Sequence, residues 1–141
     1  MPLRGEYAPS PVEWVRAEVE HYERTGGTAY KDRPVVLLTT RGVRTGLLRK
    51  TPLMRVEHRG AYAAVASMAG SDRNPAWYGN LLADPLVELR DGTDSFDLRA
   101  REVMRAERAR WWSRANAVFP SYADYQSATR RIIPVVVLEP T

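Results

Sequence analysis

The sequence predicts an α+β protein in which mostly antiparallel strands form a small barrel with helices at its periphery. Three observations predict this class: apolar residues recur three and four positions apart near the N-terminus, short β-branched runs follow Pro34, and an Asp91-Gly92 turn separates two alternating segments. The chain has 141 residues, enough for one modest hydrophobic core. We therefore expect a single domain over residues 1–141.

The first helix is predicted over about residues 11–25. Ser10 can cap its N-terminus, Pro11 suits its first position, and the Gly26-Gly27 pair suits its end. Its apolar stripe consists of Val12, Val15, Val19 and Tyr22. Such a stripe usually packs on the helix's own domain, and we expect the same here.

Docking of this helix on a membrane surface or a partner protein is the alternative. Binding to anionic lipid is disfavoured because four glutamates make the polar face of this helix acidic. They are Glu13, Glu18, Glu20 and Glu23. No apolar run approaches the roughly 18 residues of a membrane span, and the N-terminus lacks a signal-peptide core. We therefore expect a cytoplasmic protein, with membrane association through this helix as the alternative.

The barrel is predicted over about residues 34–138. Its strands are expected over residues 35–40, 47–57 with an interruption at Pro52, 61–66, 86–89, 96–103 and 132–138. Further helices are expected over residues 76–82, between Asn74-Pro75 and Asp84-Pro85, over 105–118, which Pro120 ends, and over 122–129.

The composition excludes several kinds of site. Cysteine is absent, which excludes disulfides, thiolate nucleophiles and Cys-ligated metals. The two histidines, His21 and His58, do not form a cluster with metal-ligand spacing, so no metal is expected. A net charge of +4 suits either nucleic acid or a small acidic ligand. Nucleic acid is disfavoured because the cations do not alternate with a row of stacking aromatics.

Residues 39–51 form a glycine-containing segment that we call the cationic turn. Gly42 and Gly46 let a ligand approach the backbone. The cations around them are Arg41, Arg44, Arg49 and Lys50. Such a turn can hold a phosphate, although it lacks the Gly-Lys-Ser/Thr ending of a Walker loop. A solvated basic hairpin is the alternative.

Residues 67–80 join the end of a strand to a glycine loop and a helix N-terminus. Backbone N–H groups exposed at such a junction can bind an anion or a carbonyl group. Trp77 and Tyr78, on the short helix, either stack on an aromatic ligand or belong to the core.

Residues 119–126 carry two tyrosines, Tyr122 and Tyr125, three positions apart on a predicted helical turn. The two phenols can close a pocket and donate hydrogen bonds or a proton. Alternatively, Tyr125 is half-buried packing and Tyr122 a surface cap. No Ser-His-Asp set, paired carboxylate or Cys-His pair is visible, so the sequence shows no set of catalytic residues for a hydrolase. An enzyme built in this way takes its chemistry from an organic cofactor.

Three stretches together resemble the deazaflavin-dependent nitroreductase family. They are Thr39-Thr40-x-Gly42-x-x-Thr45-Gly46-x-x-Arg49-x-x-Pro52-Leu53, then Ser67 followed by Asn74-Pro75-x-Trp77-Tyr78-x-Asn80-Leu81, and Pro120-Ser121-Tyr122-x-Asp124-Tyr125-Gln126-Ser127-x-Thr129-x-Arg131-x-Ile133-Pro134. The resemblance runs from about Val12 to Pro140. It implies a split β-barrel and reduced coenzyme F420, a deazaflavin with a phosphate and a glutamate-rich tail. It also implies an oxidoreductase that transfers a hydride to a quinone or a similar acceptor, nitro compounds included.

The resemblance also assigns roles to residues. For the cofactor these are Arg44, Thr45, Arg49, Lys50, Thr51, Pro52, Leu53, Ser67, Met68, Asn74, Trp77 and Asn80. Within this set, the resemblance implies that Arg44, Arg49 and Lys50 hold the phosphate and the acidic tail. The implied catalytic residues are Tyr122, Tyr125 and Ser67, with Tyr122 hydrogen-bonding or protonating the acceptor. Phe119 stands where nitroimidazole-reducing members carry a tyrosine.

Two other functions remain open. One is a non-catalytic protein of the same fold that binds a deazaflavin or a lipid. The other is an FMN-dependent oxidoreductase with a related barrel. The expected partner is a small-molecule acceptor, and the sequence does not specify an oligomeric state.

Overall fold

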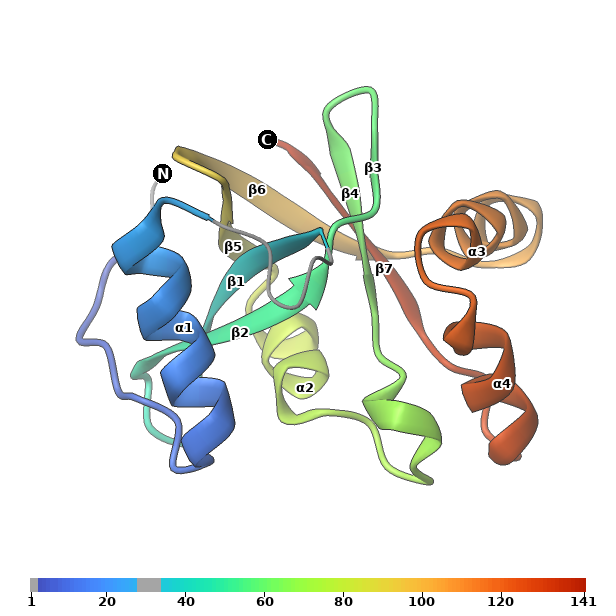
Figure 1. The fold of residues 1–141 in the computed structure, drawn as a ribbon, viewed down its shortest axis with the longest axis horizontal. Coiled ribbons are helices and arrows are strands. Elements are labelled where there is room, and N and C mark those ends of the chain that lie inside the picture. The colour runs from blue at the N-terminus through green and yellow to red at the C-terminus, as the bar shows by residue number, and fades with distance from the viewer. Residues whose placement is uncertain (1–2, 28–33) are drawn as a thin grey trace.

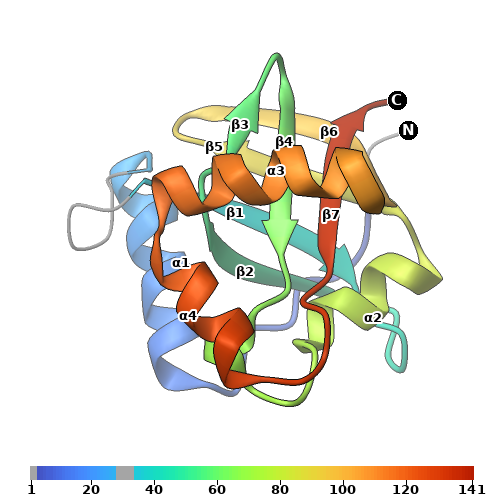
Figure 2. The same ribbon diagram turned by 90° about the vertical axis from the view of Figure 1, so that its right-hand side faces the viewer.

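The computed structural model describes residues 3–27 and 34–141. The strands of this part are β1 (Val35–Arg41), β2 (Leu48–Met54), β3 (Glu57–His58), β4 (Ala61–Val65), β5 (Leu86–Asp91), β6 (Asp94–Glu102) and β7 (Val135–Pro140). They form one sheet in the order β2-β1-β5-β6-β7-β4-β3, and its neighbouring strands are antiparallel. The sheet curls into a half-barrel (Figures 1 and 2), which confirms the predicted split-barrel fold.

The helices lie around this sheet. They are α1 (Glu13–Thr25), α2 (Ala76–Ala83), α3 (Arg105–Val118) and α4 (Ser121–Ala128), with a short 3₁₀ turn, η1 (Met68–Gly70). Helix α1 lies beside β2, whereas α3 and α4 lie at the opposite side of the molecule (Figure 1). Among the described residues, no helix is long and apolar enough to cross a membrane. The cytoplasmic location and the membrane contact of α1 stay predictions.

Helix α1 begins at Glu13, so the predicted start at Pro11 is wrong. Ser10 does not cap the helix, because its hydroxyl accepts a hydrogen bond from the amide of Val12 (3.1 Å) in a local turn. The predicted end is confirmed: Gly26 adopts a left-handed conformation with φ of 75°. Val19 and Tyr22 are buried as the stripe predicted, but Val12 is 47% exposed.

Helix α1 is fixed at its C-terminal end. The phenol of Tyr22 donates to the carbonyl of Val35 (2.9 Å) and accepts from the amide of Gly92 (2.8 Å). Gly27 lies so close to Gly92 that a Cβ would approach the Gly92 Cα to 2.5 Å. These contacts seat α1 against β1 and the turn between β5 and β6.

Strand β2 runs through Pro52, so the predicted interruption there is wrong. Pro52 pairs with Leu37 in the antiparallel register. Because β2 is an edge strand, a residue without an amide hydrogen is tolerated there. The break falls instead after Met54, where the amide of Arg55 donates to the carbonyl of Pro34 (2.9 Å) and β3 starts separately.

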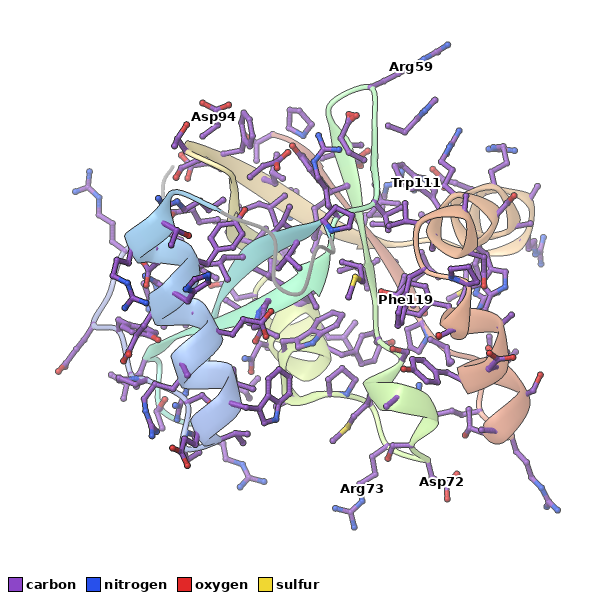
Figure 3. The ribbon with its side chains drawn as sticks, viewed as in Figure 1. Arg59, Asp72, Arg73, Asp94, Trp111 and Phe119 are labelled. Atoms are coloured by element: carbon purple, nitrogen blue, oxygen red, sulfur yellow. The ribbon has the colours of Figure 1, made fainter. Side chains whose placement is uncertain are left out.

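The core lies on both faces of the sheet. Along β7, Val136 and Leu138 enter the cluster that includes Trp77, while Val135 and Val137 enter the cluster beneath α3. In Figure 3, Trp111 lies between α3 and the strands, within this second cluster. Burial on both faces explains why β7 begins with the continuous apolar run of residues 135–138. The predicted start of this strand at Ile132 is wrong, because β7 begins at Val135, and Ile132 is 75% exposed.

Candidate functional site

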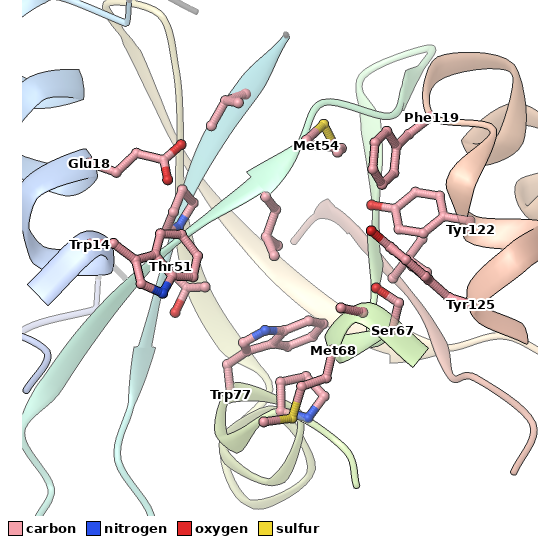
Figure 4. Close-up of a pocket in the computed structure, with 16 residues that line it drawn as sticks. Trp14, Glu18, Thr51, Met54, Ser67, Met68, Trp77, Phe119, Tyr122 and Tyr125 are labelled. Carbon is pink, nitrogen blue, oxygen red and sulfur yellow. The ribbon is translucent and has the colours of Figure 1, made fainter. Parts of the chain in front are cut away.

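A cavity of about 520 Å³ opens between α1, η1 and α4, with β2 along one side (Figure 4). Eight of the predicted site residues line it: Thr51, Pro52, Leu53, Ser67, Met68, Trp77, Tyr122 and Tyr125. Its other described lining residues are Trp14, Glu18, Val35, Met54, Val65, Ala69, Pro75 and Phe119. Its size is that of an ordinary small-molecule or cofactor site.

One wall of the cavity is aromatic; we call Phe119, Tyr122 and Tyr125 the tyrosine wall. The rings of Phe119 and Tyr122 meet edge to face at 5.1 Å, and those of Tyr122 and Tyr125 at 6.4 Å. Both phenol oxygens point into the cavity (Figure 4). Tyr122 is only 6% exposed, so the alternative of a surface cap is wrong.

The environment keeps Tyr122 protonated. Burial raises the pKa of its phenol well above the ordinary value, and the neighbouring Tyr125 raises it further. A protonated phenol in an apolar cavity is a hydrogen-bond donor at every physiological pH. Tyr122 can therefore donate to an oxygen of a bound molecule.

The short helix α2 supplies the floor. Trp77 is buried within the core and also lines the cavity, so it combines both of the alternatives that the sequence left open. Its neighbour Tyr78 packs against the same core cluster, and its phenol donates to Glu102. Burial, followed by this hydrogen bond, raises the pKa of Tyr78 to about 12. Tyr78 is therefore a half-buried residue that packs on the core, and it lies outside the described lining of the cavity.

The segment that follows β4 forms the lower edge of the cavity. Ser67 is buried, whereas Met68 is half exposed at the cavity mouth. Met68 and Ala69 both adopt left-handed backbone conformations, with φ of 45° and 53°. Side chains other than glycine rarely adopt such values, and composition gave no indication of them here.

Helix α1 supplies the opposite wall, which the sequence analysis did not predict. Trp14 and Glu18 are four positions apart and therefore share a helix face, next to the buried stripe. Glu18 is buried beside the cavity, so its assignment to the solvated polar face is wrong. The offset of these two residues from Val15 and Val19 is a signal that could have found them.

The apex of the cationic turn lies outside the described lining of the cavity. The amide of Gly42 donates to the carbonyl of Leu47 (2.8 Å), and the Thr45 hydroxyl accepts from the Leu47 amide (3.1 Å). Arg44 is exposed at the tip. These bonds give the turn a fixed backbone, with Arg44 facing solvent.

Arg49 and Lys50 bind protein groups. Arg49 donates to the carbonyls of Ala8 (3.2 Å) and Pro9 (2.9 Å). Lys50 pairs with Glu23 of α1 at 2.7 Å, and its ammonium also lies 4.6 Å from the centre of the Tyr7 ring. These two cations fasten the N-terminal segment and α1 to β2.

The two predicted asparagines also lie outside the described lining. Asn80 donates to the hydroxyl of Thr40 (3.0 Å) and accepts from the amide of Val43 (3.2 Å), so it joins α2 to the cationic turn. Asn74 accepts a hydrogen bond from Arg131 at 2.7 Å. Both side chains therefore support the backbone around the site.

The chemistry of the described lining fits a flat, largely apolar ring. Trp77, Pro52 and Leu53 offer apolar surface, and the hydroxyls of Thr51 and Ser67 offer hydrogen bonds to a ring edge. The lining residues that the structure describes include no arginine or lysine, so these residues offer no cation to an acidic tail on the same ligand. The described residues also contain no group of three metal-ligating side chains.

The fold is that of a split-barrel protein, and the described lining of its cavity has the size and chemistry that suit a flat organic cofactor. Residues 14–140 match the family described as F420H(2)-dependent quinone reductase. An F420H(2)-dependent quinone reductase of Mycobacterium tuberculosis (strain H37Rv) is 42% identical over 108 residues, which are 74% of this chain and 72% of that one. The chain belongs to this F420H(2)-dependent quinone reductase family, as its resemblance predicted.

Solved structures agree with this assignment. One is described as an F420-H2 dependent reductase; it is 46% identical, has a TM-score of 0.73 and covers 80% of this chain and all of that one. Another, described as a domain-swapped dimer, is 45% identical with a TM-score of 0.75, over 92% of this chain and all of that one. The protein is thus an oxidoreductase of a family whose cofactor is reduced coenzyme F420.

Proposed function

We propose that the protein reduces quinones in the cavity between α1, η1 and α4, where reduced coenzyme F420, when bound, supplies the hydride. The main support is the pairing, in one cavity, of a flat apolar floor with two phenols that point inward. A hydride acceptor needs orientation and charge stabilisation, and these groups can provide both.

In this proposal the floor and the lower edge hold the cofactor ring. Trp77 offers a face for stacking, and Pro52 and Leu53 offer apolar contact along β2. The hydroxyls of Thr51 and Ser67 hydrogen-bond to the ring's edge. Every one of these groups belongs to a strand or helix or lies directly beside one, so the ring is held by rigid elements.

The tyrosine wall acts on the quinone. Negative charge accumulates on a quinone oxygen as it is reduced, and a buried phenol donor stabilises that charge. Tyr122 is suited to this role because burial keeps it protonated and the surrounding rings fix its position. Tyr125 supports it as a second donor.

The cationic turn is proposed to hold the phosphate and the acidic tail. Arg44 is exposed and faces solvent, so it is open to an anion. Arg49 and Lys50 have to exchange their present partners, two carbonyls and Glu23, for the tail. Such an exchange gives a smaller net gain than binding to a solvated cation.

Quinones are favoured over nitro compounds as acceptors. Phe119 lines the cavity and packs on Tyr122, but it offers no hydroxyl group. The tyrosine wall therefore provides two phenol donors, Tyr122 and Tyr125. It lacks the third phenol that the resemblance implies for nitroimidazole-reducing members at the position of Phe119.

The test is a titration of the protein with reduced coenzyme F420, followed by fluorescence, and then addition of menadione, a soluble naphthoquinone. We expect saturable binding and a quinone-dependent oxidation of the cofactor. A nitroimidazole, tested in the same way, should react more slowly. Binding without turnover of any quinone would show a non-catalytic carrier, and a yellow protein that turns over only with bound FMN would show the flavin alternative.

A further inference from the structure

The segment after β4 carries a run of left-handed backbone conformations, which are unfavourable at Met68 and Ala69. Met68, Ala69 and Gly70 are consecutive residues with φ of 45°, 53° and 81°. L-residues keep such conformations only where the surrounding structure enforces them. Ser67 and Met68 line the cavity, so whatever enforces these conformations also shapes the site.

The guanidinium of Arg131 bridges both ends of this segment. It donates to the carbonyl of Ser67 (2.9 Å), to the carbonyl of Ser71 (2.8 Å) and to the side chain of Asn74 (2.7 Å). A planar group with several donors in a fixed geometry can meet three acceptors at once, and an ammonium group on a flexible stem cannot do this in the same way.

The same segment is joined to α4, which carries Tyr122 and Tyr125. The side chain of Gln126 donates to the carbonyl of Arg131 (2.7 Å) and accepts from the amide of Ile133 (2.9 Å), so α4 fixes the backbone beside Arg131. Gly70 packs directly on α4: a Cβ there would lie 3.2 Å from the Cα and the carbonyl oxygen of Tyr125. In Figure 4, Ser67 lies next to Tyr125.

We propose that Arg131 is a positioning residue that holds the Ser67–Met68 edge of the cavity in register with the tyrosine wall. It lies outside the described lining of the cavity and acts through the residues that it binds. The proposal rests on the proposed function, because the register matters for the distance between the cofactor ring and the quinone. Small errors in such a distance reduce turnover strongly.

The test compares Arg131→Ala and Arg131→Lys with Arg130→Ala, a matched control at the exposed neighbouring arginine. We expect both Arg131 variants to lower kcat for menadione at saturating cofactor by about tenfold or more, while Arg130→Ala stays within about twofold of the wild type. Guanidinium ion, at a concentration that leaves the unfolding midpoint unchanged, should restore part of the activity of Arg131→Ala. It should not restore Arg131→Lys.

Gly70→Ala is a second variant that leaves Arg131 in place. Its new Cβ would lie 3.2 Å from the Cα and the carbonyl oxygen of Tyr125, so the segment and α4 have to shift by a few tenths of an ångström, and φ of 81° is unfavourable for alanine. We therefore expect a loss of kcat with no rescue by guanidinium ion. Wild-type kcat in both Arg131 variants would overturn the proposal. A loss that follows only the unfolded fraction, without rescue, would also overturn it and show a merely structural role.

Amide hydrogen exchange in the cofactor-free protein separates this proposal from the proposed function. We expect residues 67–74 to exchange about tenfold faster in Arg131→Ala than in Arg130→Ala. Faster exchange in a protein that reduces no quinone would refute the proposed function and retain the positioning of the segment by Arg131. Unchanged exchange would refute the positioning itself.

Discussion

The tyrosine wall and the cationic turn differ in what their polar groups contact. The phenols of Tyr122 and Tyr125 point into a cavity, whereas Arg49 and Lys50 bind carbonyls, a carboxylate and an aromatic ring of the same chain. A group that faces the cavity gives a ligand the full energy of their interaction. A group that must first leave a protein partner gives only the energy of the new interaction minus that of the lost one. We therefore expect the tyrosine wall to control turnover and the cationic turn to make a moderate contribution to affinity.

The largest effect is expected from Tyr122→Phe. The variant keeps the ring packing against Phe119 and removes the donor, so quinone reduction at saturating cofactor should slow by about a hundredfold. Cofactor affinity should not change. Steady-state rates with menadione and a separate fluorescence titration measure the two quantities.

Tyr78→Phe is the matched control for this variant, because that phenol binds Glu102 on the core side of α2. It should reduce menadione at close to the wild-type rate. If Tyr122→Phe reduces menadione as fast as the wild type, Tyr122 only forms a wall. If Tyr122→Phe instead loses cofactor affinity, it belongs to the cofactor side of the cavity.

Arg49→Ala tests the cationic turn. We expect the cofactor Kd to rise by about three- to tenfold, less than the full strength of a charge-assisted hydrogen bond because Arg49 gives up two carbonyl partners, while kcat at saturating cofactor changes little. Affinity in the wild type should also fall as salt rises. Arg59→Ala, at the exposed tip between β3 and β4 (Figure 3), is the control and should bind normally. Normal affinity with slow turnover in Arg49→Ala would contradict the assignment.

A smaller effect of opposite sign is expected from Glu23→Gln. This change removes the carboxylate that Lys50 contacts at 2.7 Å. A free ammonium should bind the acidic tail better, so the cofactor Kd should fall by about two- to threefold, the scale of a partly exposed ion pair. Glu20→Gln on the same helix is the control. A weaker cofactor affinity in Glu23→Gln would show that Lys50 needs Glu23 in order to be placed.

The smallest effect is expected at alkaline pH, and it is an effect of Tyr78 on the free energy of unfolding. The pKa of Tyr78 is raised to about 12, so above pH 10 the unfolded chain loses this proton while the folded protein keeps it. The free energy of unfolding therefore falls from about pH 10 up to about pH 12. Between pH 9 and pH 11, the unfolding midpoint of Tyr78→Phe should fall less than that of the wild type. An equal fall would contradict the raised pKa.

Local patterns predicted the part of this molecule that depends on neighbouring residues. Helix α3 has the predicted bounds because its length and its end at Pro120 are set by residues within it and next to it. The pair Tyr122 and Tyr125 shares a face because a spacing of three positions fixes that geometry on a helix. Because the two side chains share a face, the packing of α4 beside η1 places both of them in the same cavity.

Contacts between distant segments could not be predicted in this way. Arg49 binds carbonyls 40 and 41 positions away, and only the pairing of the N-terminal segment with β2 brings them together. Pro52 is tolerated because β2 is an edge strand, which depends on the order of the whole sheet. The carbonyls of Ser67 and Ser71, on either side of the left-handed Met68 and Ala69, likewise bind Arg131, 64 and 60 positions away.

The claim that the cavity, and not the cationic turn alone, receives the cofactor is tested most directly by amide hydrogen exchange with and without coenzyme F420. We expect protection of backbone amides on both sides of the cavity, in residues 51–54 and 67–70, with further protection in α4. The amides of residues 42–47 should change less. Protection confined to residues 42–47 and α2, with the cavity segments unchanged, would contradict the assignment.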